Sequence, residues 1–162
     1  MKHNARTNAL VGAGVAACAV AGTLLNEPQS RWYRALRKPD WQPAPAVFPI
    51  AWTALYAAVG LSSASVINRL NKAGWDQDAA AFARALGVNL ALNTGWNALF
   101  FRVRNLPVAT VGAAALAVSS ADLARRAATD GGWQVWGLRA YAGWCVCATA
   151  LTGRIAQLNP RT

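Results

Sequence analysis

Five long apolar segments follow one another along the 162-residue chain, and the charged residues collect in the stretches between them. A helix needs about 20 apolar residues to cross the hydrocarbon layer, with about 17 as the lower limit. The second segment meets this length comfortably, and the others draw on flanking aromatic and arginine residues. The pattern predicts one all-α integral membrane domain over 1–162, a bundle of five transmembrane helices. The predicted spans cover residues 9–25, 47–67, 79–101, 106–121 and 133–156.

The first segment also has the layout of a signal peptide, because Lys2 and Arg6 precede its apolar core. However, no small-residue cleavage site leads into a polar domain, and four further apolar segments follow. We therefore interpret it as a retained first helix. The composition agrees with a membrane protein, since 55% of the residues are hydrophobic and 14% are charged, whereas soluble domains average about 25% charged residues.

The net charge of +10 raises the possibility of nucleic-acid binding. The arginines flank the apolar segments, however, as residues do that anchor at lipid headgroups. We therefore expect the lipid bilayer, and no nucleic acid, as a partner. The 16 Lys and Arg residues divide equally between the two predicted faces, with Lys2 on one and Arg161 on the other. The positive-inside rule consequently gives no orientation.

Metal chemistry has little support in the sequence. All three cysteines lie in apolar segments, and Cys145 and Cys147 are two residues apart, so on a helix they point to nearly opposite sides. The single histidine, His3, lies in the polar N-terminal tail. The sequence predicts no metal site, no catalytic residues and no obligatory cofactor.

The longest connection, residues 26–46, combines aromatic, cationic and proline residues. Ser30 is placed to cap a short helix over 31–38, which would end before Pro39. The aromatic and aliphatic side chains give the loop an apolar side: Trp32, Tyr33, Leu36 and Trp41. Such a segment either rests at headgroup level as an interfacial helix or folds as a lid over the helix ends. The three prolines that follow favour a shaped lid.

Helical spacing gathers aromatic and amide side chains onto shared faces in three segments. These groups are Phe48, Trp52 and Tyr56; Asn93, Trp96 and Asn97; and Tyr141, Trp144 and Ala148. A carboxamide in the membrane is costly unless it bonds another helix or a bound molecule. Both interpretations of the asparagines stay open on geometry alone. Small residues also recur every four positions at Gly14, Cys18 and Gly22, a seam for internal packing or for a homodimer.

Several of these residues together resemble the tryptophan-rich sensory protein family, also called TspO, translocator protein or peripheral benzodiazepine receptor. The resemblance extends over essentially the whole chain. It rests on Trp32-Tyr33, Lys38-Pro39-x-Trp41-x-Pro43, Trp52, Leu92-Asn93, Trp96, Phe100-Phe101, Tyr141, Trp144 and Leu158-Asn159. It implies a five-helix fold whose first loop caps an intramembrane ligand pocket. The ligand-binding residues that we expect there are Trp32, Trp41, Phe48, Trp52, Tyr56, Asn93, Trp96, Asn97, Tyr141, Trp144 and Ala148.

The same resemblance implies a receptor or sensor for tetrapyrroles such as protoporphyrin IX and haem, and for other flat hydrophobic molecules, sterols included. Transport of such molecules, or light-dependent porphyrin breakdown, is the alternative. No internal repeat supports a carrier, and no acid–base pair supports conventional catalysis. The Ala- and Arg-rich composition suggests a bacterial cell envelope.

The chain departs from the family pattern at five positions that we identify: Ala44, Ile50, Gly112, Ala140 and Thr152. The family's sterol-recognition pattern also fails, because no tyrosine lies between Leu151 and Arg154. A reversed version of that pattern occurs in the first loop, as Arg31-x-Tyr33-x-x-Leu36. The missing tyrosine of the sterol-recognition pattern lowers the expectation of a sterol ligand.

Overall fold

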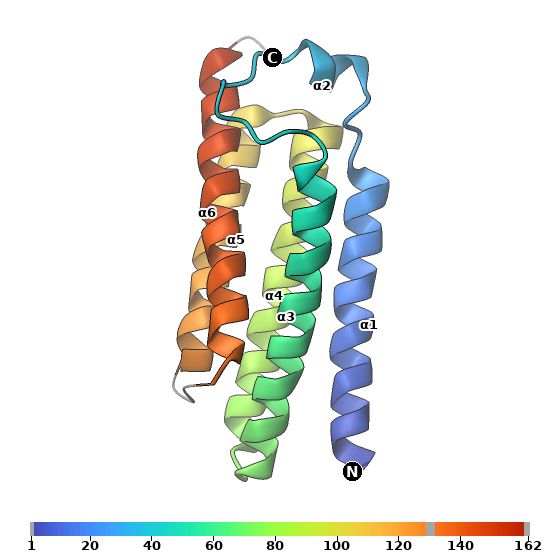
Figure 1. Ribbon diagram of the computed structural model, residues 1–162, viewed down its shortest axis with the longest axis vertical. Coiled ribbons are helices and arrows are strands. Elements are labelled where there is room, and N and C mark those ends of the chain that lie inside the picture. The colour runs from blue at the N-terminus through green and yellow to red at the C-terminus, as the bar shows by residue number, and fades with distance from the viewer. Residues whose placement is uncertain (1, 129–131, 161–162) are drawn as a thin grey trace.

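The computed structural model describes residues 2–128 and 132–160. Five long helices stand side by side along one axis, and a short helix lies across one end (Figure 1). We call the end that carries the short helix the loop end, and the other, near the N-terminus, the turn end. The elements in chain order are α1 (Lys2–Leu25), α2 (Arg31–Ala35), α3 (Val47–Lys72), α4 (Asp76–Ala98), the π-helix η1 (Leu99–Val103), α5 (Leu106–Ala128) and α6 (Gln134–Leu158).

Three of the long helices are apolar and long enough to cross a membrane. They contain the stretches Asn4–Leu25, Val47–Lys72 and Leu106–Ala128. The other two, α4 and α6, carry more polar residues, and these include buried ones such as Asn89, Asn93 and Thr152. The described residues form helices and no strand, as predicted, and α1, α3 and α5 extend beyond the predicted apolar segments. Of the charged residues named above for the two predicted faces, the side chain of Lys2 and the whole of Arg161 lie outside the described residues.

Three small residues of α1, Gly14, Cys18 and Gly22, face the inside of the bundle. A Cβ atom built on Gly22 would lie 3.5 Å from the Tyr56 hydroxyl, and one on Gly14 would lie 3.6 Å from Leu90. Cys18, between them, is buried against α4, with Sγ 3.5 Å from the Leu90 carbonyl oxygen. The spacing seen in the sequence is therefore an internal seam that lets α1 approach α3 and α4 closely.

A Schellman turn joins α3 to α4 at the turn end. Gly74 has φ 77°, the Trp75 N–H donates to the Leu70 carbonyl at 2.9 Å, and the Gly74 N–H donates to the Asn71 carbonyl at 3.2 Å. This motif needs a residue in the left-handed region, which glycine adopts without a Cβ clash. The turn brings Trp75 back beside Leu70.

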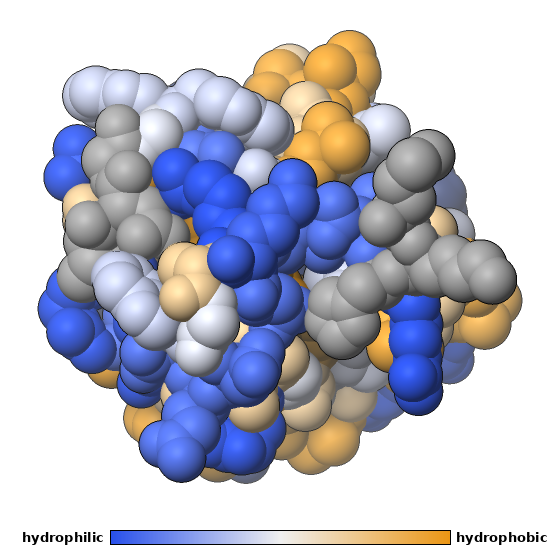
Figure 2. Space-filling model, turned by 90° about the horizontal axis from the view of Figure 1, so that it is seen from below, coloured by the Kyte–Doolittle hydropathy of each residue, from blue (hydrophilic) through white to orange (hydrophobic). Residues whose placement is uncertain are grey.

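Hydrophilic residues gather over the turn end, and hydrophobic residues appear mainly toward the outline of that view (Figure 2). This distribution suits a bundle whose sides face lipid and whose end faces water. Ion pairs form at this end between residues three and four positions apart on α5. Asp122 accepts hydrogen bonds from Arg125 and Arg126, each at 2.6 Å.

The first loop folds over the helix ends as a lid. Ser30 caps α2, as predicted, and accepts a hydrogen bond from the Tyr33 N–H at 3.2 Å. The predicted helix over 31–38 was too long, because α2 ends at Ala35. Leu36 instead adopts an extended conformation (ψ 136°) and is buried in an apolar cluster with Phe100, Phe101, Leu106, Ala109 and Ile155. Burying this leucine ends the helix before Pro39 is reached.

Candidate ligand site

Six aromatic and phenolic rings from α3, α4 and α6 meet below the lid. We call them the aromatic cluster: Phe48, Trp52, Tyr56, Trp96, Tyr141 and Trp144. Trp52 is at its centre, with ring centroids 5.5 Å from Tyr56, 6.1 Å from Trp96, and 6.5 Å from both Tyr141 and Trp144. The four-residue spacing on α3 aligns Phe48, Trp52 and Tyr56, because i and i+4 side chains share a helix face. Phe48 reaches across to Trp144, with the centroids 6.2 Å apart.

The π-helix connects this cluster to the lid. Trp96 contacts Phe100 at 6.2 Å, and Phe100 contacts Trp32 at 5.7 Å and Tyr33 at 6.2 Å. Phe101 is also buried and lies 5.7 Å from Tyr33. The wider turn of η1 allows the two consecutive phenylalanines to be buried together, and such π-turns occur often at functional sites. A continuous path of rings therefore runs from Trp52 to the lid.

A chain of buried hydrogen bonds, which we call the polar network, crosses the bundle beside the rings. The Tyr56 hydroxyl donates to Asn93 Oδ1 at 2.8 Å, and Asn93 Nδ2 donates to the Tyr141 hydroxyl at 3.1 Å. Tyr141 donates in turn to Asn89 Oδ1 at 3.0 Å. Asn89 Nδ2 continues the chain to Ser120 Oγ at 3.0 Å. The network joins α3, α4, α5 and α6, and it satisfies polar groups that would otherwise be costly in the membrane.

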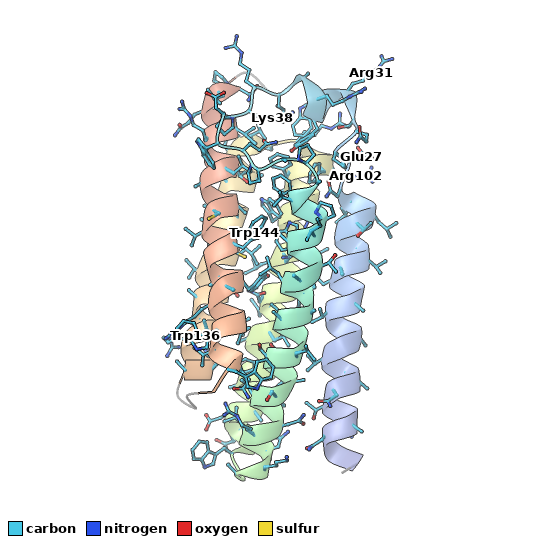
Figure 3. The ribbon with its side chains drawn as sticks, viewed as in Figure 1. Glu27, Arg31, Lys38, Arg102, Trp136 and Trp144 are labelled. Carbon is cyan, nitrogen blue, oxygen red and sulfur yellow. The ribbon has the colours of Figure 1, made fainter. Side chains whose placement is uncertain are left out.

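Three contacts hold the lid in place. The Asn159 side chain at the end of α6 accepts a hydrogen bond from the Arg37 N–H at 3.0 Å and donates to the Arg37 carbonyl at 2.9 Å. Glu27 pairs with Arg102 at 2.5 Å and with Arg104 at 3.7 Å (Figure 3). Leu36 supplies the apolar contact between these two polar anchors.

The lid carries an excess of positive charge. Arg31, Arg34 and Arg37 are exposed, and none has an ion-pair partner among residues 2–128 and 132–160. Lys38 Nζ lies 4.4 Å from the centre of the Tyr33 ring, a cation–π contact. Burial lowers the pKa of Lys38, and burial raises the pKa of Tyr33, because desolvation disfavours the charged form of each.

The structure gathers most of the predicted site residues but separates a few. Trp41 is 55% exposed on the lid and contacts none of the cluster rings within the described part of the chain. Trp32 reaches the cluster through Phe100. Ala148 is partly buried one turn beyond Trp144 on α6, and its carbonyl accepts a hydrogen bond from Thr152.

Asn93 and Asn97, both predicted as ligand-binding residues, differ in their surroundings. Both amide atoms of Asn93 are engaged by Tyr56 and Tyr141, and the residue is fully buried. Asn97 Nδ2 donates to the Asn93 carbonyl at 3.0 Å, and no described residue donates to Asn97 Oδ1. Asn89 was missed in the sequence, although Asn89, Asn93 and Asn97 are spaced by four and so share one face of α4.

The cluster rings pack against one another, and among the cavities of the described residues are two of about 300 Å³ each, one of which reaches the cluster residue Trp96. One is a groove between α4 and α5, lined by Leu92, Gly95, Trp96 and Leu99 among others. The second lies at the turn end. The described residues contain no group of three or more His, Cys, Asp or Glu side chains that could hold a metal ion.

Comparison with known proteins assigns the family. Residues 9–158 match the TspO/MBR family. The chain is 35% identical over 156 residues to the tryptophan-rich sensory protein of Cereibacter sphaeroides, covering 90% of this chain and 88% of that protein. It is 34% identical over 140 residues to the human translocator protein, covering 83% of this chain and 78% of that one. Given this match across nearly the whole length, and the fold and aromatic cluster described above, the chain belongs to the TspO/MBR family of membrane proteins.

Proposed function

We propose that this protein is a membrane receptor or sensor that binds flat hydrophobic molecules, tetrapyrroles first among them, in the aromatic cluster beneath the lid. Membership of the family supports a receptor or sensor role in a membrane. The observation that carries the ligand assignment is the ring arrangement around Trp52. Indole faces stack favourably on extended aromatic surfaces, and a tetrapyrrole macrocycle presents such a surface.

The lid supplies the complementary charge for such a ligand. Protoporphyrin IX and haem carry propionate groups, and arginine forms strong charge-assisted hydrogen bonds with carboxylates. Arg31, Arg34 and Arg37 are available for this role, whereas Arg102 and Arg104 are paired with Glu27. A macrocycle among the rings would therefore place its propionates toward the lid.

A macrocycle among these rings would require them to separate, because the Trp52 ring centroid lies within 6.5 Å of the centroids of Tyr56, Trp96, Tyr141 and Trp144. The polar network ties Asn93 to neighbouring helices, so we assign Asn93 a structural role. Asn97 is the better candidate for ligand contact, since its carboxamide oxygen is available as an acceptor. In this proposal Trp52, Trp144, Trp96 and Phe48 surround the ligand, Tyr56 and Tyr141 back them, Trp32 closes the top, and Trp41 and Ala148 lie at the margin.

We also propose that all five long helices cross the membrane, including α4 and α6. The buried polar side chains of these two helices pair with each other inside the bundle. Exposed residues of the same helices include Val88 and Val146, which suit contact with lipid. A bacterial cell envelope is the proposed location, because bacterial proteins are among the relatives.

Equilibrium binding of protoporphyrin IX tests the proposed site. Changing Trp52 or Trp144 to Ala should weaken binding by about tenfold, since the loss of one stacking partner and its buried area is worth about 1.4 kcal/mol. Trp136→Ala is the matched control, because Trp136 lies on the outer side of α6 near the turn end and is 69% exposed (Figure 3). Equal losses in all three variants would show that the site is misplaced.

Light-dependent breakdown of the bound porphyrin is a second candidate function, favoured by the oxidisable tryptophan and tyrosine rings in contact with Trp52. Illumination of the complex should then consume porphyrin faster than illumination of free porphyrin in the same detergent. A Trp52→Phe variant that binds porphyrin should slow this loss. Equal rates with and without protein would remove the enzymatic role.

A further inference from the structure

The cavity at the turn end is separate from the aromatic cluster. It has a volume of about 300 Å³ and lies where the end of α3, the start of α4 and the end of α5 come together. Its lining combines apolar side chains with charged ones, namely Leu70, Trp75, Phe82, Asp78, Arg125 and Arg126. Such a mixture suits an amphipathic ligand with a charged head.

The backbone explains the apolar wall. The Schellman turn around Gly74 returns the chain so that Trp75 lies beside Leu70, the pair of positions that make a hydrophobic contact in this motif. Phe82 and Leu70 are buried and form the inner side. Trp75 is 55% exposed, as expected for an indole at the boundary between lipid and water.

The charged residues that line the cavity, which we call the charged rim, form two groups of opposite sign, one on α5 and one on α4. On α5, Asp122 pairs with both Arg125 and Arg126, so these three residues carry a net charge of +1. The Arg125 side chain is 71% exposed and uses only Nη2 in this pair, which leaves its other N–H groups available. On α4, Asp78 is exposed and has no ion-pair partner within residues 2–128 and 132–160.

A ligand that satisfies both sides must carry an anion and a hydrogen-bond-donating cation. A phosphate suits the arginine side, because guanidinium groups bind phosphate oxygens through charge-assisted hydrogen bonds. A primary ammonium suits the exposed carboxylate of Asp78, whereas a quaternary ammonium has no N–H to donate. The rim therefore matches phosphoethanolamine better than phosphocholine or an anionic headgroup without a cation.

The position of the cavity indicates a lipid as the source of this headgroup. It lies at the ends of two helices that can span a membrane, Val47–Lys72 and Leu106–Ala128, and so at the depth of the headgroups. Hydrophilic residues cover this end of the molecule (Figure 2). We infer that the turn-end cavity binds the headgroup of phosphatidylethanolamine, with the phosphate at Arg125, the ammonium at Asp78 and apolar lipid atoms against Trp75 and Phe82.

Native mass spectrometry of the full chain, offered equimolar phosphatidylethanolamine, phosphatidylcholine and phosphatidylglycerol with identical acyl chains, tests this inference. The protein should retain phosphatidylethanolamine about fivefold better than phosphatidylcholine, a preference of the size that one exposed ion pair can supply. Asp78→Asn should reduce this preference to near unity. Arg125→Gln should weaken retention of both lipids.

Asp76→Asn is the matched control, because Asp76 lies in the same first turn of α4, carries the same charge and does not line the cavity. It should leave the preference unchanged, and thermal unfolding of each variant checks that the bundle is intact. Soluble phosphoethanolamine should compete only weakly, since it lacks the acyl chains. Equal retention of the three lipids by the unaltered protein, or equal effects of Asp78→Asn and Asp76→Asn, would overturn the inference, as would full competition by soluble phosphoethanolamine.

Discussion

The polar network passes through the Tyr141 hydroxyl. Tyr141→Phe removes only this oxygen atom, yet we expect it to lower the free energy of unfolding substantially. The Tyr141 hydroxyl accepts a hydrogen bond from Asn93 at 3.1 Å and donates one to Asn89 at 3.0 Å, and all three side chains are almost fully buried. Hydrogen bonds between membrane helices contribute about 0.6 kcal/mol on average and about 1.7 kcal/mol at most. Removing the hydroxyl breaks two of them and leaves two buried amide atoms unpaired, each at a cost of about 1–3 kcal/mol in soluble proteins.

We therefore expect Tyr141→Phe to lower the free energy of unfolding by about 1–3 kcal/mol, mostly through the unpaired amide atoms. Tyr56→Phe should cost less, because it breaks one short bond to Asn93 and a weak 4.0 Å bond from the Cys18 thiol, which also donates to Asn93 Oδ1, and because Tyr56 is only partly buried. Unfolding of the purified protein in mixed micelles by increasing sodium dodecyl sulfate, followed by circular dichroism, measures both. The double variant should be non-additive, since both hydroxyls act on Asn93.

A loss below about 0.3 kcal/mol for Tyr141→Phe, with additive behaviour in the double variant, would refute this reasoning. It would mean that the amides find other partners. Asn93 would then be free to contact ligand, and its structural assignment would fail.

The remaining predictions concern the turn, the lid and the topology. Gly74→Ala should lower the free energy of unfolding by about 1 kcal/mol, because alanine is strained at φ 77°. The control is Gly87→Ala, at a helical position where an added Cβ meets nothing within 4 Å. In the same unfolding assay it should be neutral or stabilising. Asn159→Ala removes the side-chain hydrogen bonds to Arg37. It should speed amide hydrogen exchange in residues 31–40 without changing exchange in α3. Unchanged exchange in residues 31–40 would contradict the anchoring role of Asn159. Cysteines placed at Gln29 and Gln77 should react with a membrane-impermeant thiol reagent from opposite sides of the membrane, and labelling from one side alone would exclude the five-span topology.

The helical architecture was predicted from the sequence because a helix that crosses lipid must be apolar, whereas the segments between such helices can carry arginine and lysine. The Ser30 cap was predicted too, because it depends on residues only three positions apart in the sequence. The end of α2 was not, because the burial of Leu36 against distant residues such as Phe101 and Ile155 decides it. Long-range packing carries no local signal in the sequence.

Some features of the candidate site were likewise predicted from local spacing, whereas others depend on contacts between distant parts of the chain. The three shared faces were predicted from helical i, i+3 and i, i+4 spacing, and in the structure rings from all three faces lie around Trp52. The spacing did not show that Asn93 would be engaged on both sides, since this depends on where Tyr141 of a distant helix reaches. Trp41 was grouped with the other loop aromatics, but its exposure depends on the path of the lid after Pro39. The π-turn that buries Phe100 and Phe101 together also had no recognisable sequence pattern.

An experimental structure of the protoporphyrin IX complex will show whether a tetrapyrrole occupies the aromatic cluster beneath the lid. We expect the macrocycle in contact with Trp52 and Trp144, its propionates toward Arg31, Arg34 or Arg37, and the rings of the cluster moved apart to admit it. A macrocycle seated instead in the groove between α4 and α5, against Leu92 and Leu99 with Trp52 and Trp144 unmoved, would show that the aromatic cluster is not the ligand site.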